Sequence, residues 1–443
     1  MTAPAPTHTD TATPPDAATA PASKPRTVLF ASLIGTTIEF YDFYIYATAA
    51  VLVFPRLFFP ASDPGAATLQ SLATFAIAFL ARPVGSALFG HFGDRIGRKS
   101  TLVAALLTMG ISTVVIGLLP TYAQIGVAAP LLLALCRFGQ GLGLGGEWGG
   151  AVLLATENAP PGKRAWFGMF PQLGAPIGFF LSGATFLLLG EVMSDEAFFS
   201  WGWRVPFLAS ALLVAIGLYI RLRITETPDF QKVLARRARV RMPMVTVLRE
   251  HGRTMLLGAF AAMGGFAFFY LMTVFALTWG TTRLGFTRQQ FLLLQLFAIV
   301  FFALTIPLSA LLADRVGRRA ALMLVSVAIG TFGLLYGPLF GAGTWLPVGI
   351  FMVLGMSLVG FVYGPLGTLL AELFPAEVRY TGASLTFNLA SILGASVAPY
   401  IALWLGSNYG LGHVGYYLSA ASLVSFVALL VLGRREVAQG LSD

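Results

Sequence analysis

The chain has 443 residues, of which 57% are hydrophobic and only 11% are charged, and its mean hydropathy is +0.79. Soluble domains carry about 25% charged residues, so this composition argues against a cytosolic enzyme and against a secreted globular protein. One cysteine, Cys136, and four scattered histidines exclude an internal disulfide framework and show no spacing for paired metal ligands. We expect neither a metal nor a cofactor. The net charge of +9 makes the placement of the basic residues the next question.

Apolar runs long enough to cross a bilayer follow one another from Val28 onward. Residues 1–26, with six prolines and no apolar run, predict a disordered tail that is neither a signal peptide nor a packed segment. A spanning helix needs about 20 apolar residues, and the runs lack the period-two alternation of an outer-membrane barrel. Twelve spans are predicted, at approximately 28–53, 69–90, 100–120, 130–154, 165–190, 203–221, 254–280, 288–311, 319–340, 345–370, 380–406 and 411–433.

The basic residues are distributed unequally between the two sides of the predicted membrane. An even number of spans places both ends of the chain on one side, and that side receives 22 of the 28 lysines and arginines. Because cytoplasmic loops are enriched in Lys and Arg, both termini are predicted to be cytoplasmic, in a multi-pass protein of a bacterial inner membrane. The asymmetry accounts for the net charge without any nucleic-acid partner.

Two motifs each occur twice, in the same order. The sequence GHFGDRIGRK at 90–99, between the second and third spans, matches ALLADRVGRR at 310–319, between the eighth and ninth. The sequence ENAPPGKR at 157–164, after the fourth span, matches ELFPAEVR at 372–379, after the tenth. The offsets of 220 and 215 residues are nearly equal, which indicates an internal duplication.

The duplication predicts two six-helix bundles with the same topology, at 27–221 and 254–433. A cytoplasmic linker at 222–253 joins them, and a second cytoplasmic tail covers 434–443. We interpret the arginine-rich linker as solvated, with surface helices against the lipid headgroups. Parallel repeats of this kind place a substrate site near the membrane midplane, between the two bundles.

The repeated loops are candidates for a gate. Glycine permits the tight turn between consecutive spans, and the aspartate can face a helix N-terminus from the other bundle. The basic residues can pair with nearby acids, so that the contacts hold one conformer and break in the other. The alternative is that these charges only fix topology. The predicted gate residues are Gly90, Asp94, Arg95, Gly97, Arg98, Lys99, Glu157, Arg164, Asp314, Arg315, Gly317, Arg318, Glu372 and Arg379.

These motifs resemble those of a known group of transporters. The loop at 90–99 is similar to the signature loop of the major facilitator superfamily, and Arg137-x-x-x-Gly141-x-Gly143-x-Gly145 resembles its second motif, associated with proton coupling. The sequences EFYDFYIY at 39–46, GGEWGG at 145–150 and WGWRVPF at 201–207 narrow the resemblance to the metabolite:proton symporter family. That family includes permeases for shikimate, α-ketoglutarate, citrate and proline or betaine.

The resemblance covers about residues 27–433 and implies an all-α fold of twelve transmembrane helices in two bundles related by a pseudo-two-fold axis. It further implies proton-coupled uptake of a small organic acid by alternating access, and we expect a monomer surrounded by membrane lipids. Phe40 stands where the family usually has Trp, and Ala310 replaces the first glycine of the second loop. Neither departure removes a charge.

Five charged residues lie deep inside predicted spans, all of them in the first half: Glu39, Asp42, Arg82, Arg137 and Glu147. Each costs about 2.5–3.5 kcal/mol at the bilayer centre, so a function for them is expected. Three acids against two arginines leave one carboxylate without a full partner, and burial favours the protonated form of such a group. The competing interpretation is a static ion network that fixes helix packing.

We expect Glu39 and Asp42 to be the proton-coupling pair, because they share one face of the first span with Tyr46. Arg137 is expected to be their switchable counter-charge. Arg82 is expected to serve the same pair or to contact an anionic substrate. Glu147 is expected either to take part in coupling or to bind helix ends near the cytoplasmic side.

The second half has no ionisable residue deep in a span, so its contribution to the site is predicted to be uncharged. Each candidate can equally serve as an interhelical hydrogen-bonding residue. The predicted substrate-binding residues are Arg82, Arg137, Tyr46, Tyr270, Thr273, Gln295, Tyr363 and Asn388.

Four other functions remain to be weighed. Uptake of a proline- or betaine-like osmolyte and proton-driven efflux of a drug-like compound both occur among proteins with similar motifs. A receptor or channel is disfavoured because no soluble output domain or continuous polar pore is apparent. An intramembrane enzyme is disfavoured because no span carries a hydrolase or zinc motif.

Overall fold

The computed structural model describes residues 25–60, 64–235, 240–396 and 398–439, and within these ranges the chain forms helices and turns without any strand. Of the tails predicted at 1–26 and 434–443, residues 1–24 and 440–443 lie outside the described residues, while residues 25–26 and 434–439 belong to helices. The helices of the first half, here called the first bundle, are α1 (Pro25–Leu52), α2 (Phe54–Leu57), α3 (Pro64–Arg95), α4 (Arg98–Leu118), α5 (Tyr122–Ile125), α6 (Ala128–Glu157), α7 (Arg164–Val192), α8 (Asp195–Ser200) and α9 (Val205–Leu222), with a 3-10 turn at Gly202–Arg204.

Two short helices, α10 (Pro228–Ala235) and α11 (Pro243–Glu250), lie in the linker. The helices of the second bundle are α12 (Gly252–Tyr270), α13 (Ala276–Thr282), α14 (Arg288–Val316), α15 (Arg318–Phe332), α16 (Trp345–Glu372), α17 (Arg379–Ala395), α18 (Ala398–Tyr409) and α19 (Leu411–Gln439), with a 3-10 turn at Gly333–Leu335 and π-helical turns at Leu271–Phe275 and Tyr336–Phe340.

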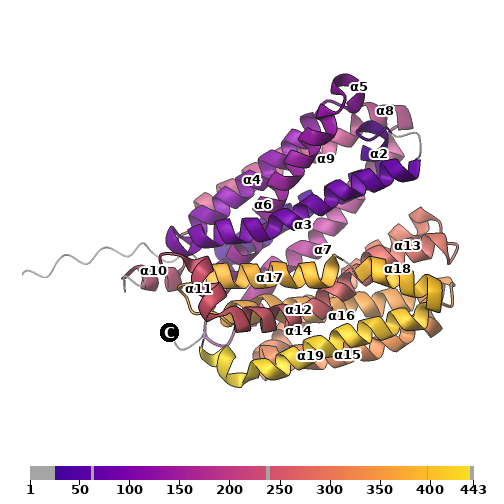
Figure 1. Ribbon diagram of the computed structural model, residues 1–443. Helices are drawn as coiled ribbons and strands as arrows, with labels where there is room; N and C mark the ends of the chain where they lie inside the picture. Colours follow the sequence, from indigo (N-terminus) through magenta and orange to yellow (C-terminus); the bar gives the residue numbers. More distant parts are fainter. Residues whose placement is uncertain (1–24, 61–63, 236–239, 397, 440–443) are drawn as a thin grey trace, which may run out of the picture.

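Eleven helices or continuous helical segments among the described residues are long and apolar enough to cross a membrane. The one predicted span that is not among these eleven, at 69–90, lies in α3, a 32-residue helix that runs along the first bundle (Figure 1). Several predicted spans are built from two consecutive helices, such as α12 with α13 and α17 with α18. The all-α, twelve-span fold predicted from the sequence is therefore confirmed.

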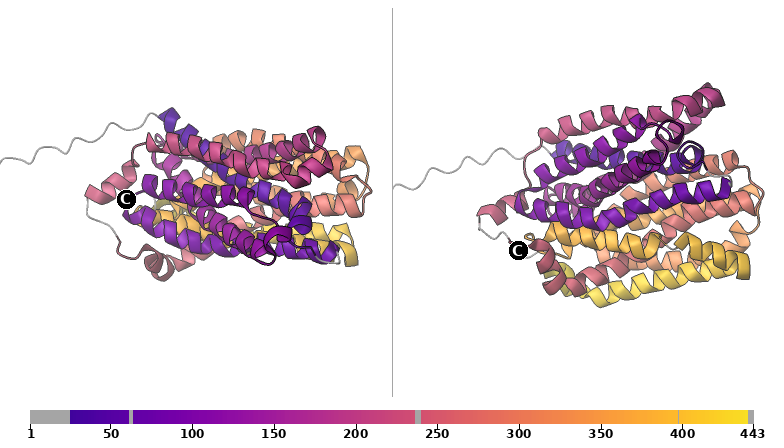
Figure 2. Two further views of the ribbon diagram at one scale, coloured as in Figure 1. Left: turned by 90° about the horizontal axis from the view of Figure 1, so that it is seen from above. Right: turned by 45° about the horizontal axis from the view of Figure 1, so that its top comes forward.

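The two bundles meet along α3 and α17 and along α7, which packs against α14 and α16. They lie close together at the end that carries α10 and α11 and diverge toward the end that carries α2, α5, α8 and α13 (Figures 1 and 2). We call the first of these the linker end. The structure thus holds the bundles together at the linker end and apart at the opposite end.

Glycine forms the turns that reverse the chain at the linker end. Gly97, between α3 and α4, has φ 129°, and Gly317, between α14 and α15, has φ 92°. Residues that carry a side chain rarely adopt such positive φ values, whereas glycine adopts them readily, so a single glycine suffices for each turn. The tight turns predicted from the repeated motif are confirmed, and they place both aspartates of the motif beside the opposite bundle.

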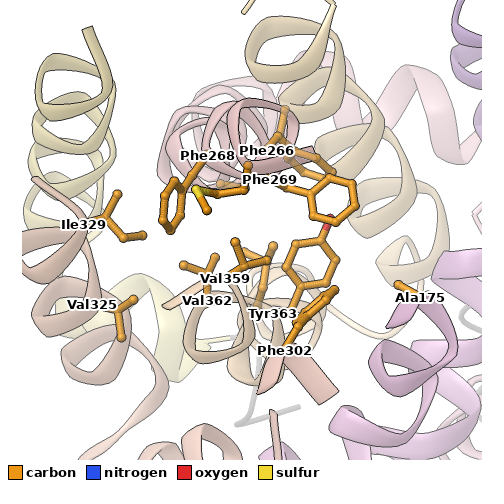
Figure 3. Packing of buried hydrophobic residues seen from close by; sticks show 14 of the residues in the cluster. Ala175, Phe266, Phe268, Phe269, Phe302, Val325, Ile329, Val359, Val362 and Tyr363 are labelled. Carbon is orange, nitrogen blue, oxygen red and sulfur yellow. The ribbon is translucent and has the colours of Figure 1, made fainter. Parts of the chain in front are cut away.

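The second bundle is filled by aromatic and aliphatic side chains. Figure 3 shows Phe266 and Phe269 of α12 near Tyr363 of α16. Phe268 of the same helix lies toward Ile329 of α15. Burying a side chain of this size contributes about 1.5–3 kcal/mol relative to water, but lipid is as apolar as these rings, so close packing holds the helices together in the membrane. Rigid packing on this scale suits a bundle that moves as a body.

Candidate functional site

The two motif aspartates each accept hydrogen bonds from the first turn of a helix in the opposite bundle. Asp94 accepts from the backbone N–H groups of Tyr380 (3.1 Å) and Thr381 (3.0 Å) in α17, and from the Thr381 hydroxyl (2.7 Å). Asp314 accepts from the backbone N–H groups of Ala165 (3.0 Å) and Trp166 (2.9 Å) in α7. A helix N-terminus carries unsatisfied donors and partial positive charge, so a carboxylate binds it well. The expected contact with the opposite bundle is present twice.

The motif arginines connect these aspartates to the motif glutamates. Arg98 lies 3.3 Å from Asp94 and 3.5 Å from Glu157, and it is fully buried. In the second bundle Arg318 lies 3.6 Å from Asp314 and 3.2 Å from Glu372. The duplicated sequence therefore folds into two matching charge clusters at the linker end.

Arg379 joins the two bundles because its guanidinium lies 3.4 Å from Glu157 across the interface. Arg164, its counterpart in the first bundle, lines a small cavity together with Glu157, Glu372 and Arg379. The gate residues predicted from the two repeated motifs thus meet at one place.

Three of the predicted gate residues lie at the margin of this network. Arg95 is exposed and contacts His91 (3.3 Å), and Arg315 is also exposed. Lys99 donates to the carbonyl of Leu222 at 2.9 Å, which attaches the start of α4 to the end of α9. These positions fit a topological role better than a role inside the gate.

The start of the linker is packed against the charge cluster of the first bundle rather than solvated. Glu226 accepts from the backbone N–H groups of Arg98 (3.0 Å) and Lys99 (3.3 Å), and so caps α4. Phe230 is buried, and Arg98 Cζ lies 4.9 Å from the centroid of its ring. The interpretation of the whole linker as a solvated segment is therefore wrong for this part, because charged and aromatic side chains anchor it; residues 236–239 lie outside the described ranges.

Asp229 of α10 adds a contact across the interface, since it lies 2.8 Å from Arg379 of the second bundle. Burial alone would raise the pKa of Asp229, but the charges and hydrogen bonds of Arg379 and Lys232 together outweigh this effect and hold the pKa below its usual range. Asp229 is therefore a stable anion at neutral pH.

Glu147 of α6 forms a buried ion pair that the sequence did not indicate. Its carboxylate binds the guanidinium of Arg221 in α9 through both oxygens, with one bond at 2.9 Å, and Arg221 also donates to the carbonyl of Leu102 at 2.6 Å. Both side chains are buried. In the sequence, Arg221 is the last residue of the predicted span at 203–221, next to the linker. The count of three acids against two arginines was therefore wrong, because a third arginine reaches into the bundle.

The carboxyl groups of Glu39 and Asp42 in α1 are buried without a salt bridge to any described lysine or arginine. Asp42 accepts one hydrogen bond from Ser210 Oγ in α9 (2.9 Å), and the Thr113 hydroxyl of α4 is its other polar neighbour. One oxygen of each carboxyl, Glu39 Oε2 and Asp42 Oδ1, has no hydrogen-bond partner among the described residues. A charged carboxylate is unfavourable in such a position.

Arg137 of α6 lies against aromatic rings of α1. Its Cζ is 4.0 Å from the ring centroid of Tyr46 and 4.9 Å from that of Phe43, both in α1. Its Nη1 donates to Gln140 (3.0 Å), and Gln140 in turn donates to Thr113 (2.8 Å), the neighbour of Asp42. Arg137 and Asp42 are thus connected through two intervening side chains.

Arg82 of α3 reaches the second bundle near the middle of the α3–α17 interface. Its Nε donates to Oδ1 of Asn388 at 2.9 Å, and its Cζ lies 5.7 Å from the ring centroid of Phe79 and 6.0 Å from that of Phe387. Its electrostatic neighbours include Glu39 and Tyr44 of α1, Arg137 of α6, Tyr270 of α12 and Tyr363 of α16. Arg82 therefore stands where the polar side chains of both bundles converge.

The remaining predicted substrate residues mostly satisfy backbone groups. Gln295 of α14 donates to the carbonyls of Met272 (3.3 Å) and Thr273 (2.7 Å) at the π-helical turn, where the helical hydrogen bonds are interrupted. Thr273 donates to its own helix at Phe269, and Tyr46 pairs with Thr74 at 2.6 Å. The bonds of Gln295 and Tyr46 thus connect two helices, as the interhelical alternative describes, whereas that of Thr273 stays within one helix.

Two residues at the interface were missed by the sequence reasoning. Gln172 of α7 accepts from Trp148 Nε1 (3.0 Å) and donates to the carbonyl of Tyr363 (3.0 Å) in the other bundle. Trp148 stacks on Phe387, with ring centroids 3.5 Å apart. A glutamine among apolar residues in the fifth span was the available signal for Gln172. Among the described residues, no three His, Cys, Asp or Glu side chains group as metal ligands.

Comparison with known proteins agrees with this architecture. The family model described as sugar (and other) transporter matches residues 27–242. An inner membrane metabolite transport protein of Escherichia coli K12 is 60% identical, over 93% of this chain and 94% of its own length. The shikimate transporter of the same organism is 38% identical, over 95% of this chain and 97% of its own length.

The structure also resembles solved structures. A major facilitator proton:xylose symporter bound to 6-bromo-6-deoxy-D-glucose aligns with a TM-score of 0.75 and 17% sequence identity, over 92% of this chain and 95% of that one. The proteins similar in sequence are named as transporters rather than enzymes. The chain therefore belongs to the metabolite transporters of the major facilitator superfamily, the family that its motifs resemble.

Proposed function

We propose that this protein is a proton-coupled symporter that takes up a small organic acid by alternating access. The observation that carries the proposal is the pair of buried carboxyl groups in α1, Glu39 and Asp42, each with one oxygen that lacks a hydrogen-bond partner among the described residues. An ionised carboxylate is costly there, whereas a protonated carboxyl is tolerated. Both groups therefore suit a cycle in which a proton is bound on one side of the membrane and released on the other.

Arg82 connects the proton to the substrate. It lies within electrostatic range of Glu39 and has one hydrogen-bond acceptor, Asn388, among the described residues. While Glu39 is ionised, its charge offsets that of Arg82. Once Glu39 is protonated, the positive charge of Arg82 is available to an anion, so that substrate and proton bind together.

Asp42 and Arg137 form the second part of the proposed coupling site. Because Gln140 and Thr113 separate them, Arg137 acts on Asp42 through hydrogen bonds rather than through a direct ion pair. Protonation of Asp42 turns one hydrogen-bond acceptor of its carboxyl group into a donor. This change reaches Arg137 through the hydrogen bonds of Thr113 and Gln140. The cation–π contact with Tyr46 holds the guanidinium in place meanwhile.

The linker-end clusters serve as the gate of the transport cycle. Asp94 and Asp314 each bind the opposite bundle, and Arg379 bridges to Glu157 and Asp229. We place the linker end in the cytoplasm because the basic residues of the repeated motifs gather there. The described conformer is then closed to the cytoplasm.

Uptake into proteoliposomes under an imposed pH gradient tests the proposal. The panel contains mono-, di- and tricarboxylates, aromatic acids and betaines, each with the gradient inward, outward and absent. We expect an inward gradient to drive accumulation of at least one carboxylate. Accumulation that appears only when the gradient drives export identifies an efflux pump and contradicts uptake.

A zwitterionic osmolyte is the second candidate substrate. Arg82 lies near the rings of Phe79 and Phe387, and aromatic faces attract quaternary ammonium groups just as Arg82 attracts a carboxylate. Glycine betaine carries both groups. Accumulation of betaine in preference to every anionic carboxylate would decide for this candidate.

A further inference from the structure

The hydrogen bond between Arg82 and Asn388 joins the two bundles at the predicted substrate site. The Arg82 guanidinium only donates, so the amide oxygen of Asn388 must face it. The other end of the Asn388 amide donates to Ser86 Oγ (2.6 Å) and to the Ser384 carbonyl (2.9 Å). Asn388 of α17 is therefore bound to two residues of α3, Arg82 and Ser86, which lie one helical turn apart.

This contact lies on the same pair of helices as one of the gate contacts. Asp94 of α3 holds the N-terminus of α17 at Tyr380 and Thr381. Asn388 lies eight residues further along α17 than Tyr380, about 12 Å at the α-helical rise. Hydrogen bonds thus join α3 to α17 at two places, at the linker end and beside Arg82. Separation of the bundles must break the bonds at both places.

A carboxylate is a better ligand for Arg82 than the amide of Asn388. The amide oxygen is neutral and takes one N–H, whereas a carboxylate accepts two parallel hydrogen bonds from a guanidinium and carries the opposite charge. Hydrogen bonds to ionised partners are roughly twice as strong as those between neutral groups. A substrate carboxylate at Arg82 would therefore replace the Asn388 oxygen.

We propose that Asn388 occupies the carboxylate position at Arg82 in the empty transporter, and that a substrate carboxylate displaces it and so releases α17 from α3. This inference rests on the proposed function and deepens it, because it assigns a single carboxylate as the recognised group and gives its binding a mechanical consequence. Asn388 is then a positioning residue that competes with the substrate. The substrate itself breaks the α3–α17 contact beside Arg82.

The charges around Arg82 are compatible with a single carboxylate. Glu39 from α1 is its acidic neighbour, Tyr270 and Tyr363 from the second bundle are phenols, and Arg137 is the other cation within range. Protonation of Glu39 leaves Arg82 as the positive group beside Asn388. The ring of Phe387, stacked on Trp148, offers an apolar surface for the body of the substrate.

Substitutions of Asn388 separate this proposal from its rivals. Asn388→Asp provides a tethered carboxylate for Arg82, so we expect it to hold the linker end closed and to block carboxylates. Asn388→Leu removes the acceptor while keeping a similar volume, so we expect the open population to rise about tenfold, as for loss of one hydrogen bond to a charged group. Asn408→Asp, at an exposed position in α18, is the matched control and should behave as the unmodified protein.

The readout is the distance between two spin labels at the linker end, measured in lipid nanodiscs without any pH gradient. The labels are attached to Lys163→Cys and Ala320→Cys, both at exposed positions, after Cys136→Ser. Shikimate and benzoate are added in parallel with their neutral carboxamides, and with glycine betaine. We expect the acids, but not the amides, to raise the long-distance population of the unmodified protein, and neither to act on Asn388→Asp.

Three outcomes overturn the inference. They are an Asn388→Asp protein that opens as readily as Asn388→Leu, an Asn388→Asp protein that still responds to the acids, and an unmodified protein that responds to no acid or equally to acid and amide. Because no gradient is present, these outcomes are independent of proton coupling. Loss of gradient-driven uptake would contradict the proposed symport while leaving the displacement of Asn388 standing.

Discussion

Asp94 and Asp314, which lie 220 residues apart in the sequence, make the same contact in opposite directions across one interface. Asp94 reaches from the first bundle to the N-terminus of α17, and Asp314 reaches from the second bundle to the N-terminus of α7. Neither contact depends on the side chain of the helix that it caps, apart from the Thr381 hydroxyl. The duplication therefore gives the proposed gate two equivalent contacts, both of which must break if the bundles separate at the linker end.

Asp94→Asn and Asp314→Asn should each shift the protein away from the conformer that is closed at the linker end. A charged group at a partly buried helix N-terminus contributes up to about 2 kcal/mol, so each substitution should raise the open population by roughly tenfold. The spin-label pair at 163 and 320 measures this shift. Asp195→Asn, at an exposed position in α8, is the control; an unchanged distance distribution in both gate variants would contradict the assigned role.

The Glu147–Arg221 pair predicts an asymmetric stability effect. Arg221→Gln leaves the Glu147 carboxylate buried without its cation, which should cost about 3–5 kcal/mol of unfolding free energy. The double variant Glu147→Gln, Arg221→Gln removes both charges and should recover most of that loss. Thermal unfolding in detergent compares the two, and a double variant less stable than the single one would show that the pair is not the stabilising unit.

Gly35 provides a second test of the same pair. A Cβ atom at Gly35 would collide with the guanidinium of Arg221 and approach Glu147 Oε1 to 3.0 Å, so the pair occupies the space that glycine leaves in α1. Gly35→Ala should therefore lower the unfolding temperature although alanine is the better helix former. Gly190→Ala is the control, since no atom lies within 4 Å of a Cβ at that position. Equal stability of the two variants would contradict the packing argument.

The contact between Asp229 and Arg379 should not respond to pH in the physiological range. The pKa of Asp229 is held below its usual range, so its stabilising effect is fully present above the pKa of an unfolded aspartate, about 3.9, and is lost only as the pH falls through the lower folded-state value. Asp229→Asn should therefore open the linker end to the same extent at pH 5.5 and pH 8. An effect of the substitution that disappears at pH 5.5 would contradict this assignment.

The fold and the gate were accessible from the sequence because each depends on a local or repeated signal. Apolar runs report membrane spans directly, and the glycine of the repeated Asp-Arg-x-Gly-Arg motif, at 97 and 317, permits a tight turn between two spans. The duplication then places both aspartates at equivalent positions, and a helix N-terminus is their natural partner. Predicting these features required no knowledge of which distant side chains pack against each other.

The interior of the site depended on contacts that no local pattern encodes. Arg221 looked like one more basic residue beside the linker, but its long side chain reaches Glu147 through the space left by Gly35. Asn388 was recognised as polar, yet its pairing with Arg82, 306 positions away, follows only from the packing of α17 on α3. The placement of Arg137 over Tyr46 has the same origin.

The central claim is that buried carboxyl groups of α1 couple substrate movement to protons, and Asp42→Asn in proteoliposomes tests it most directly. With one proton per substrate, a gradient of one pH unit supports about tenfold accumulation in the unmodified protein. The account predicts that Asp42→Asn abolishes this accumulation but retains counterflow exchange of labelled substrate, while Glu191→Gln, at an exposed position in α7, retains both. Full gradient-driven accumulation by Asp42→Asn would contradict the account.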